Sequence, residues 1–290
     1  MIILTLFFLI ILLIFPKDVS ATVSQSLFIC LREIIPSLFP FSVISGLLAG
    51  LFSGMKIPFF TLISRLFNIS EKSVWAYLTG LLCGYPIGGK LVLELYEKGD
   101  ISEKEKDRLL IFANNPGPGF IMGVIGTALF KSVRAGVIIY ISFIITSVIF
   151  GILTRKKSQK TVIIPIYKGE RKRFFPLLAK SIKDSIEAVI SITGVICFFS
   201  SVSAIINKLS LPYLSLFTGL LEMTGGVYNI YSLTLPLKLK ASLCAFIIGF
   251  SGVCVFMQLK VISDKIKTTA YFSNKLLYGA LCALITYILM

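Results

Sequence analysis

The sequence contains no histidine and little charge. Asp, Glu, Lys and Arg together make up only 15% of its 290 residues, against about 25% in an average soluble domain. The missing histidine excludes catalysis and metal binding by imidazole groups. The shortage of charge, with 56% hydrophobic residues and a mean hydropathy of +0.90, excludes an ordinary soluble domain. A chain of this composition is predicted to lie in a membrane.

Motifs for catalysis, cofactors and disulfides are also missing. The sequence has no P-loop, Rossmann fingerprint, nucleophile elbow or metal-ligand cluster. Its cysteines show no C-x-x-C spacing and lie mostly within apolar segments, so we predict packing residues and not a disulfide framework. They are Cys30, Cys83, Cys197, Cys244, Cys254 and Cys282. We therefore expect no enzyme activity, no cofactor and no metal site.

Long apolar runs are abundant. A helix needs about 20 mostly apolar residues to cross a bilayer. Uncharged runs near this length lie at 34–55, 136–154, 188–207 and 241–259, and a shorter one closes the chain at 276–290. With the remaining apolar segments they predict an all-α, polytopic transmembrane protein of the cell membrane, with six or more membrane segments.

The first apolar segment, residues 1–15, raises the question of a signal peptide. Val-Ser-Ala at 19–21 resembles a cleavage site, but no basic region precedes the apolar run. We therefore favour a retained first span over a signal peptide that is removed.

Positive charge is concentrated in one segment of a chain whose net charge is +15. Residues 155–183 hold ten Lys and Arg against the single Glu170. Because this run joins two apolar segments, the positive-inside rule predicts a cytoplasmic loop. Anionic lipid headgroups are its expected contacts, and nucleic acid is not an expected partner. The predicted organisation is an N-terminal helix and connector at 1–30, a first repeat at 31–154, the basic loop at 155–182 and a second repeat at 183–290.

The two predicted repeats share one order of motifs. Thr-Gly-Leu-Leu occurs at 79–82 and again at 218–221, and a glycine pair follows each copy, at 88–89 and 225–226. In each half an apolar helix is then interrupted by glycines, and an apolar span closes the half. This order predicts two copies of one unit, an arrangement from which many transporters are built.

Charge favours an inverted arrangement of the two copies. If each Thr-Gly-Leu-Leu segment is a re-entrant hairpin that turns back at its glycines, the larger positive excess lies inside. The basic residues that join the loop on the inner side are then Lys56, Arg65, Lys72, Lys260, Lys265, Lys267 and Lys275. The ones left outside are Lys131, Arg134, Lys238 and Lys240. We therefore predict two inverted repeats, each with a re-entrant hairpin and a broken helix.

The strongest local signal is a helix break, Ala-Asn-Asn-Pro-Gly-Pro-Gly at 113–119. Pro116 and Pro118 cannot donate backbone hydrogen bonds, and in lipid such a break must be buried in protein or line a wet cavity. Asn114 and Asn115 could bond the freed backbone groups, as in a structural kink, or could bond a polar solute. The sequence leaves both readings open.

Glu222 and Lys90 are the ionisable residues at the predicted hairpin tips. An ionisable group at membrane depth usually faces a partner or a pathway. Glu222 could contact a solute, a cation or a proton, or it could form an ion pair with Lys90. The candidate solute-binding residues at the tips and breaks are Tyr85, Lys90, Asn114, Asn115, Gly117, Glu222, Thr224, Asn229 and Ser251.

These motifs resemble those of the YlbJ family of sporulation integral membrane proteins. The resemblance rests on Gly-Tyr-Pro-Ile-Gly-Gly-Lys at 84–90, on residues 108–118 around the break, and on Leu-Glu-Met-Thr-Gly-Gly at 221–226. Pro-Ser-Leu-Phe-Pro-Phe at 36–41 and Gly-Phe-Ser-Gly-Val at 249–253 fit the same pattern. The likeness covers nearly the whole chain, which is short for the family, and Pro116 stands where the family typically has serine.

The resemblance implies a fold and a function. The family is grouped with nucleoside-recognition, or Gate, proteins, whose relatives include concentrative nucleoside transporters and the membrane part of ferrous-iron transporters. It implies two inverted Gate-like repeats and a role in endospore formation in a Gram-positive bacterium. We expect a transporter or channel-like protein for a small, nucleoside-like solute, and the alternative is a non-transporting membrane scaffold for spore envelope assembly. The expected partners are the lipid bilayer and this solute, and a homo-oligomer is left open.

Overall fold

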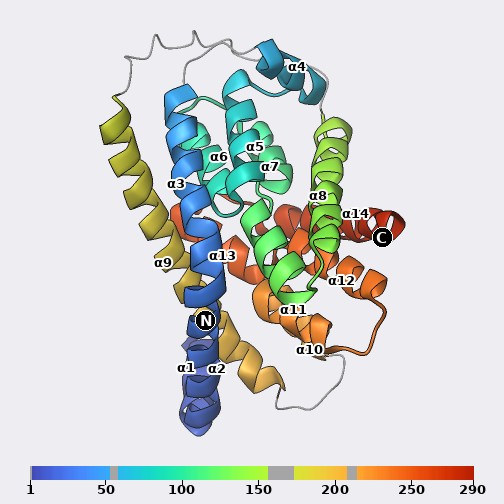
Figure 1. Cartoon of the computed structure of the whole chain (residues 1–290). Helices are drawn as coiled ribbons and strands as arrows, with labels where there is room; N and C mark the ends of the chain where they lie inside the picture. Colours follow the sequence, from blue (N-terminus) through green and yellow to red (C-terminus); the bar gives the residue numbers. More distant parts are fainter. Residues whose placement is uncertain (1, 53–57, 156–172, 208–213) are drawn as a thin grey trace.

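The chain is helical throughout the part that the computed structural model describes, residues 2–52, 58–155, 173–207 and 214–290. These ranges hold α-helices and two π-helices, and no strand (Figure 1). In chain order the elements are α1 (Ile2–Ile14), α2 (Pro16–Ile29), η1 (Cys30–Ile34), α3 (Ile35–Phe52), α4 (Pro58–Phe67), α5 (Glu71–Cys83), α6 (Ile87–Glu97), α7 (Glu103–Phe112), η2 (Gly119–Leu129), α8 (Val133–Leu153), α9 (Phe174–Asn207), α10 (Leu214–Leu221), α11 (Met223–Ser232), α12 (Leu237–Phe250), α13 (Gly252–Ile262) and α14 (Thr268–Leu289).

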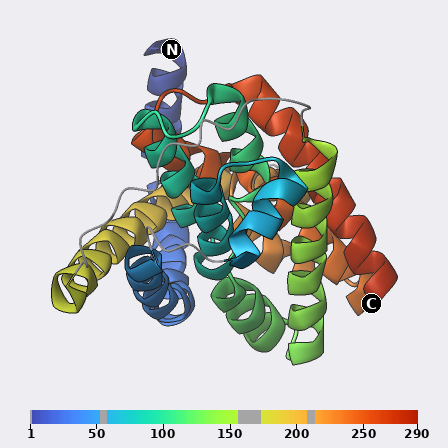
Figure 2. The same ribbon diagram turned by 90° about the horizontal axis from the view of Figure 1, so that it is seen from above.

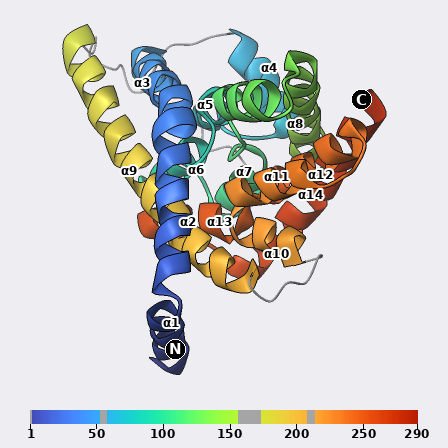
Figure 3. The same cartoon turned by 60° about the horizontal axis from the view of Figure 1, so that its bottom comes forward.

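Within these ranges, four helical segments are long and apolar enough to cross a membrane: Val133–Leu153, Phe174–Ile206, Leu237–Ile262 and Thr268–Leu289. This confirms the predicted polytopic helical membrane protein. A fifth span results if Phe8–Ile14 and Pro16–Ile34, which bend by 96°, are counted together. Figure 3 shows α1 beyond the end of α2, outside the bundle. The count is lower than the expected six or more, because part of the apolar sequence forms shorter helices.

The first of these shorter elements is a hairpin of α5 and α6. Lys72, in the first turn of α5, forms an ion pair with Asp100, just after α6, at 2.5 Å. The start of α5 and the end of α6 therefore lie next to each other. Its arms touch backbone to backbone, because a Cβ atom on Gly80 would lie 3.1 Å from the Cα atom of Gly88. A side chain at either glycine would separate the arms.

The second hairpin consists of α10 and α11. A Cβ atom on Gly219 would lie 3.1 Å from the Cα atom of Gly226, so these arms are closed in the same way. Glu222 forms the turn, and its carboxylate accepts the N–H groups of Thr224 at 2.7 Å and Gly225 at 2.5 Å. The glycine of each Thr-Gly-Leu-Leu motif thus has the same structural role in both halves of the chain.

Charged side chains at the start of α7 hold one end of the molecule together, which we call the polar end. Arg108 donates to the carbonyl groups of Phe67 at 2.7 Å and Gly151 at 3.3 Å, which joins α7 to the ends of α4 and α8. Lys267, between α13 and α14, forms an ion pair with Glu103 at 3.0 Å. Their hydrogen bond lowers the pKa of Glu103 and raises the pKa of Lys267.

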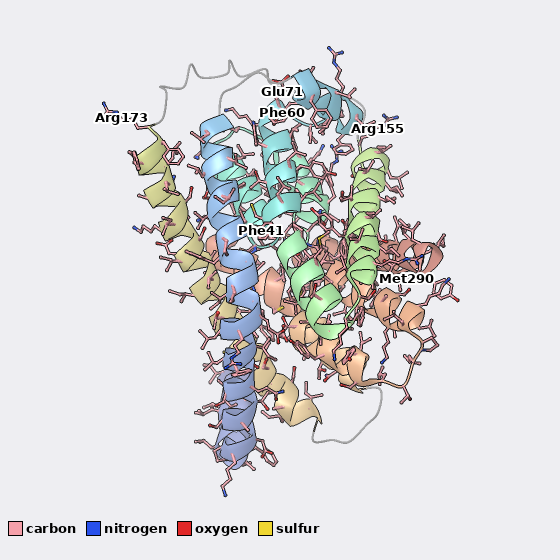
Figure 4. The ribbon with its side chains drawn as sticks, in the orientation of Figure 1. Phe41, Phe60, Glu71, Arg155, Arg173 and Met290 are labelled. Carbon is pink, nitrogen blue, oxygen red and sulfur yellow. The ribbon has the colours of Figure 1, made fainter. Side chains whose placement is uncertain are left out.

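Basic residues from two parts of the sequence lie at this polar end. Figure 4 shows Arg155 and Arg173 at the same end of the molecule as Glu71, and Lys267 is tied to that end through α7. One detail differs from the sequence analysis: α9 begins at Phe174, so the end of the predicted loop 155–182 is helical. Most of the rest of this loop, residues 156–172, lies outside the described residues.

The other end of the molecule is formed by the ends of η2, α11 and α14 and the start of α12. The ring centroids of Phe130 and Tyr231 lie 6.0 Å apart, and Lys240 donates to the Tyr231 carbonyl group at 2.6 Å. The Lys238 ammonium nitrogen lies 4.3 Å from the ring centroid of Tyr287. Helix α8 runs between the two ends, and at 1.5 Å per residue its 21 residues extend over about 30 Å.

Two packed flanks enclose the hairpins. Helices α3 and α9 lie against each other on one side, where the hydroxyl groups of Ser42 and Ser185 form a buried hydrogen bond of 2.7 Å. Helices α8 and α14 pack together on another side (Figure 2), with the ring centroids of Phe150 and Tyr278 5.1 Å apart. The tips of both hairpins are buried between these flanks.

Candidate functional site

The tips of the two hairpins meet in the interior. The hydroxyl group of Tyr85, in the turn of the first hairpin, donates to the sulfur atom of Met223 at 2.5 Å. Met223 is the first residue of α11, and both side chains are buried. The contact joins residues 138 positions apart in the sequence. It brings together the two segments in which the sequence analysis placed most of its candidate residues.

Each tip rests on the interrupted helix of its own half. A Cβ atom on Gly84 would lie 2.4 Å from the backbone nitrogen of Gly117, inside the first break. In the second half, a Cβ atom on Gly252 would lie 3.2 Å from the carbonyl oxygen of Leu221, at the tip of the second hairpin. Backbone therefore packs directly on backbone at both places. The two hairpin tips and the two helix breaks lie together in one region.

A small cavity of about 20 Å³ lies in this region. This volume can hold a single water molecule. Its wall is built by both hairpin tips, η1, α3, η2, α9 and α13. The polar side chains in the wall are those of Tyr85, Thr224 and Gln258, and Cys254 adds a thiol group. The rest of the wall is apolar.

Two of these polar groups have no hydrogen-bond partner within the described residues. They are the hydroxyl group of Thr224 and the Oε1 atom of Gln258, and each residue is only 3% exposed. The Thr224 hydroxyl lies beside the Glu222 carboxylate but outside hydrogen-bond geometry. A buried polar group left unpaired costs about 1–3 kcal/mol. Two such groups in one cavity wall are therefore a reason to expect a bound molecule there.

The first proline of the break leaves a carbonyl group without its helical donor. In an α-helix the N–H of residue i+4 donates to the carbonyl of residue i, so Pro116 leaves the carbonyl of Phe112 free. The side-chain amide of Asn115 donates to this carbonyl instead. The hydroxyl group of Tyr278, on α14, donates to the other atom of that amide, Oδ1, at 2.7 Å. Both the nitrogen and the oxygen of the Asn115 amide thus help to hold the break.

The second proline, Pro118, leaves the carbonyl of Asn114 free in the same way. The ammonium group of Lys275 donates to this carbonyl at 2.8 Å, and Lys275 is only 1% exposed. The sequence analysis counted Lys275 among the residues of a basic loop, and this was wrong. Helix α14 begins at Thr268 and carries Lys275 into the interior, where its side chain meets the carbonyl that lacks a donor.

The nine candidate residues divide into two groups. Tyr85, Gly117 and Thr224 line the cavity. Glu222 lies next to Thr224, but both of its carboxylate oxygens accept backbone N–H groups, and among the described residues it forms no ion pair with Lys90. The predicted pairing of Glu222 with Lys90 therefore finds no support.

The other candidates contact backbone or neighbouring side chains near the site. Asn115 holds the break, and Oδ1 of Asn114 accepts the N–H of Gly89 at 3.3 Å. Asn229 donates to the Thr218 hydroxyl at 3.2 Å within the second hairpin. Ser251 joins α12 to α13 in a left-handed conformation, with φ of 72°, and its hydroxyl donates to the carbonyl of Gly249 at 3.4 Å.

Several residues of the cavity wall were not among the candidates. Gln258 could have been found, because it is an uncharged polar residue within an apolar stretch of the sequence, Val-Phe-Met-Gln-Leu at 255–259. Ile192 and Ile196 of α9 also line the cavity. Isoleucine within a long apolar run carries no signal of this kind, so only the packing of α9 on the tips could reveal them.

No protein-family model and no solved structure matches the chain. A curated protein does match: the sporulation integral membrane protein YlbJ of Bacillus subtilis (strain 168) is 24% identical over 302 residues, which cover 88% of this chain and 74% of the relative. The alignment includes most of the chain, and the helices long enough to cross a membrane agree with an integral membrane protein. Over most of its length the chain is therefore similar to a sporulation integral membrane protein, which supports the resemblance to the YlbJ family.

Proposed function

We propose that this protein is a transporter or channel-like passage for a small solute needed in spore formation, and that the solute binds where the two hairpin tips meet. The observation that carries the proposal is the cavity at this point, with the unpartnered groups of Thr224 and Gln258 in its wall. In many secondary transporters the substrate site lies at the interface of two repeats, between interrupted helices. The small cavity corresponds to a closed state, which opens when the hairpins move.

Contacts at the two ends of the molecule support the inverted arrangement that this proposal includes. The first hairpin begins and ends at the polar end, where Lys72 and Asp100 form an ion pair. The second hairpin ends at the other end, where Tyr231 contacts Phe130. Helix α7 starts at the polar end, whereas α12 starts at the other end, near Lys238. These contacts support opposite senses for the two halves.

Uptake into vesicles that contain the purified protein tests the proposal. By analogy with the nucleoside-recognition group, uridine is the first solute to try, followed by a panel of small metabolites. For a solute that is taken up, we expect Thr224→Val and Gln258→Leu each to raise the half-saturation concentration about fivefold, since a lost hydrogen bond is worth about 1 kcal/mol. Unchanged uptake in both variants would contradict the proposed site.

Thr286→Val is the matched control. The Thr286 hydroxyl is also buried without a hydrogen-bond partner among the described residues, but it lies on α14 and not in the cavity wall. Removing this hydroxyl should leave uptake unchanged. A loss of uptake equal to that of Thr224→Val would show that the effect comes from disturbed packing and not from the cavity.

A non-transporting membrane scaffold for spore envelope assembly is the second candidate. The small volume of the cavity favours it, as do the hydrogen bonds by which Asn114 and Asn115 serve the backbone. Spores separate the two functions. If the protein is a scaffold, cells that carry Thr224→Val and Gln258→Leu together should form heat-resistant spores, because the fold is intact. If it transports a solute, these spores should be heat-sensitive.

A further inference from the structure

Lys275 is an ionisable group in the interior of a membrane-spanning segment, Thr268–Leu289. Its ammonium group donates to the carbonyl of Asn114 at 2.8 Å and lies 4.9 Å from the ring centroid of Tyr278. Within the described part of the chain, no carboxylate forms an ion pair with it. A buried charge without a counter-ion is costly, and ionisable groups inside membranes usually serve a function. The proposed solute site does not use this lysine, so it needs its own explanation.

The lysine belongs to a polar face of α14. Tyr271, Lys275 and Tyr278 are four and three positions apart, so they lie on one side of the helix. Tyr278 donates to Asn115 at 2.7 Å, and the Tyr271 hydroxyl lies beside the side chains of Asn114 and Ser251. This face of the second half therefore contacts the break of the first half along its whole length, and at Ser251 it also reaches the break of its own half.

The ammonium group of Lys275 lies at a helix break, and several transporters bind a metal ion at such a break. Carbonyl groups freed where a membrane helix is interrupted coordinate Na⁺ in several transporter folds. Here Pro118 frees the carbonyl of Asn114, and the ammonium group of Lys275 occupies it. We propose that the ammonium group of Lys275 is a built-in cation that takes the place of a bound metal ion at the break between α7 and η2.

Hydrogen bonding alone does not explain the choice of lysine. A neutral side chain such as glutamine could donate to the same carbonyl group without placing a charge in the membrane. The ring of Tyr278 offsets part of the cost through a cation–π contact. In this proposal the charge has a role beyond that of a donor: it balances the dipole of the Asn114 carbonyl, as a bound Na⁺ would. One consequence rests on the proposed function, namely that solute movement needs no metal ion at this break.

Thermal unfolding of the purified protein in NaCl and in choline chloride at equal concentration tests the proposal without any transport assay. The midpoint of the wild-type protein should be the same in both salts, because its cation is covalently attached. The midpoint of Lys275→Ala should be lower in choline chloride and should rise by about 2–4 °C or more in NaCl, because Na⁺ with its water can enter the vacated space. A wild-type midpoint that rises in NaCl, or a Lys275→Ala midpoint that does not, would overturn the proposal.

Lys106→Ala is the matched control. Lys106 is also only 1% exposed, but it forms an ion pair with Asp107 at 3.2 Å and donates to a backbone carbonyl at the polar end, away from the break. Its midpoint should fall equally in both salts. If it rises in NaCl as much as that of Lys275→Ala, the response is a general effect of Na⁺ and the proposal fails.

Lys275→Gln keeps the proposal testable if Lys275→Ala does not fold. This variant retains a donor for the Asn114 carbonyl and fills most of the same space, but it has no charge. We expect it to reach normal levels in the membrane and to give spores without heat resistance. Normal spores would show that a neutral donor suffices and would overturn the proposal. Because the salt experiment does not involve a solute, its failure leaves the proposed function untouched, and a failed uptake experiment leaves the built-in cation untouched.

Discussion

Glu222 is a buried acidic residue, 2% exposed, whose side-chain oxygens are bonded by backbone and not by a cation. Its two oxygens accept the N–H groups of Thr224 and Gly225 in the first turn of α11. The N-terminus of a helix carries a partial positive charge, which stabilises a carboxylate at this position. Charge neutralisation by Lys90, one of the hypotheses that the sequence allowed, is therefore not required.

This role predicts how the residue responds to substitution. Glu222→Ala should lower the free energy of unfolding by about 0.5–2 kcal/mol, the usual cost of a lost N-cap. Glu222→Gln should cost less, because its carbonyl oxygen still accepts one N–H group. Thermal midpoints of the purified variants measure both effects.

Lys90→Met serves as the control for the ion-pair hypothesis. It should neither destabilise the protein as Glu222→Ala does nor improve the stability of Glu222→Gln when the two changes are combined. Recovery in the double variant would mean that the two side chains do form a pair, and the capping role would then be insufficient.

The hairpins of the two halves are closed in the same way, by close contact between glycines. Gly80 contacts Gly88 in the first hairpin, and Gly219 contacts Gly226 in the second. Small residues let membrane helices approach until their backbones touch, which increases dispersion contacts where lipid provides no hydrophobic driving force. The hairpins therefore depend on these four positions having no side chain.

Alanine at these glycines should disturb the hairpins, either between the arms or where an arm packs on the first break. A Cβ atom on Gly80 would lie 1.8 Å from the Ala113 carbonyl oxygen, and one on Gly226 would lie 2.3 Å from the Gly219 Cα atom. Neither neighbour can rotate away, because both are backbone atoms. We expect each variant to lose at least about 1–3 kcal/mol of stability and to accumulate poorly in the membrane, which immunoblotting of membrane fractions would show.

Gly194→Ala on α9 provides the comparison. No atom lies within 4 Å of the position that its Cβ atom would take, and alanine favours a helix over glycine by about 1 kcal/mol. This variant should be as stable as the wild-type protein or slightly more stable. If Gly80→Ala behaves in the same way, the arms of the first hairpin do not touch as described.

At the scale of the whole molecule, the arrangement of the two ends decides the topology in the membrane. The polar end collects the start of α5, the end of α6, the start of α7, the end of α8 and the link between α13 and α14. The other end collects η2, α11, α12 and α14. Since the polar end also carries Arg155 and Arg173 (Figure 4), the positive-inside rule predicts that it faces the cytoplasm.

Labelling of single cysteines in a cysteine-free background tests this assignment. Cysteines introduced at Lys98 and Asp264 should react with a membrane-impermeant reagent only from the cytoplasmic side. Cysteines at Lys131 and Thr234 should react only from the opposite side, because these positions adjoin Phe130 and Tyr231. Reaction of positions 98 and 264 from opposite sides would end the inverted arrangement.

Much of the fold follows from the sequence because its causes are local. The length of the apolar runs decides that helices cross a membrane, and the resemblance to the YlbJ family could be recognised from short motifs. The break at 113–119 was predictable because proline lacks an N–H group, and the structure has α7 end at Phe112 and η2 begin at Gly119. The glycine pairs indicated two hairpins, and their tips do contact each other through Tyr85 and Met223.

Only the tertiary structure decided which side chains serve the breaks and which face the cavity. Lys275 and Asn114 are 161 positions apart, and a lysine near other lysines carries no sign that it will be buried. Gln258 and Thr224 share a cavity wall although they lie on different helices. A carbonyl group freed by proline must find a donor when water is excluded, but the sequence does not say where along the chain that donor is. The packing of α14 against the break supplies Lys275, and no local pattern in the sequence encodes that contact.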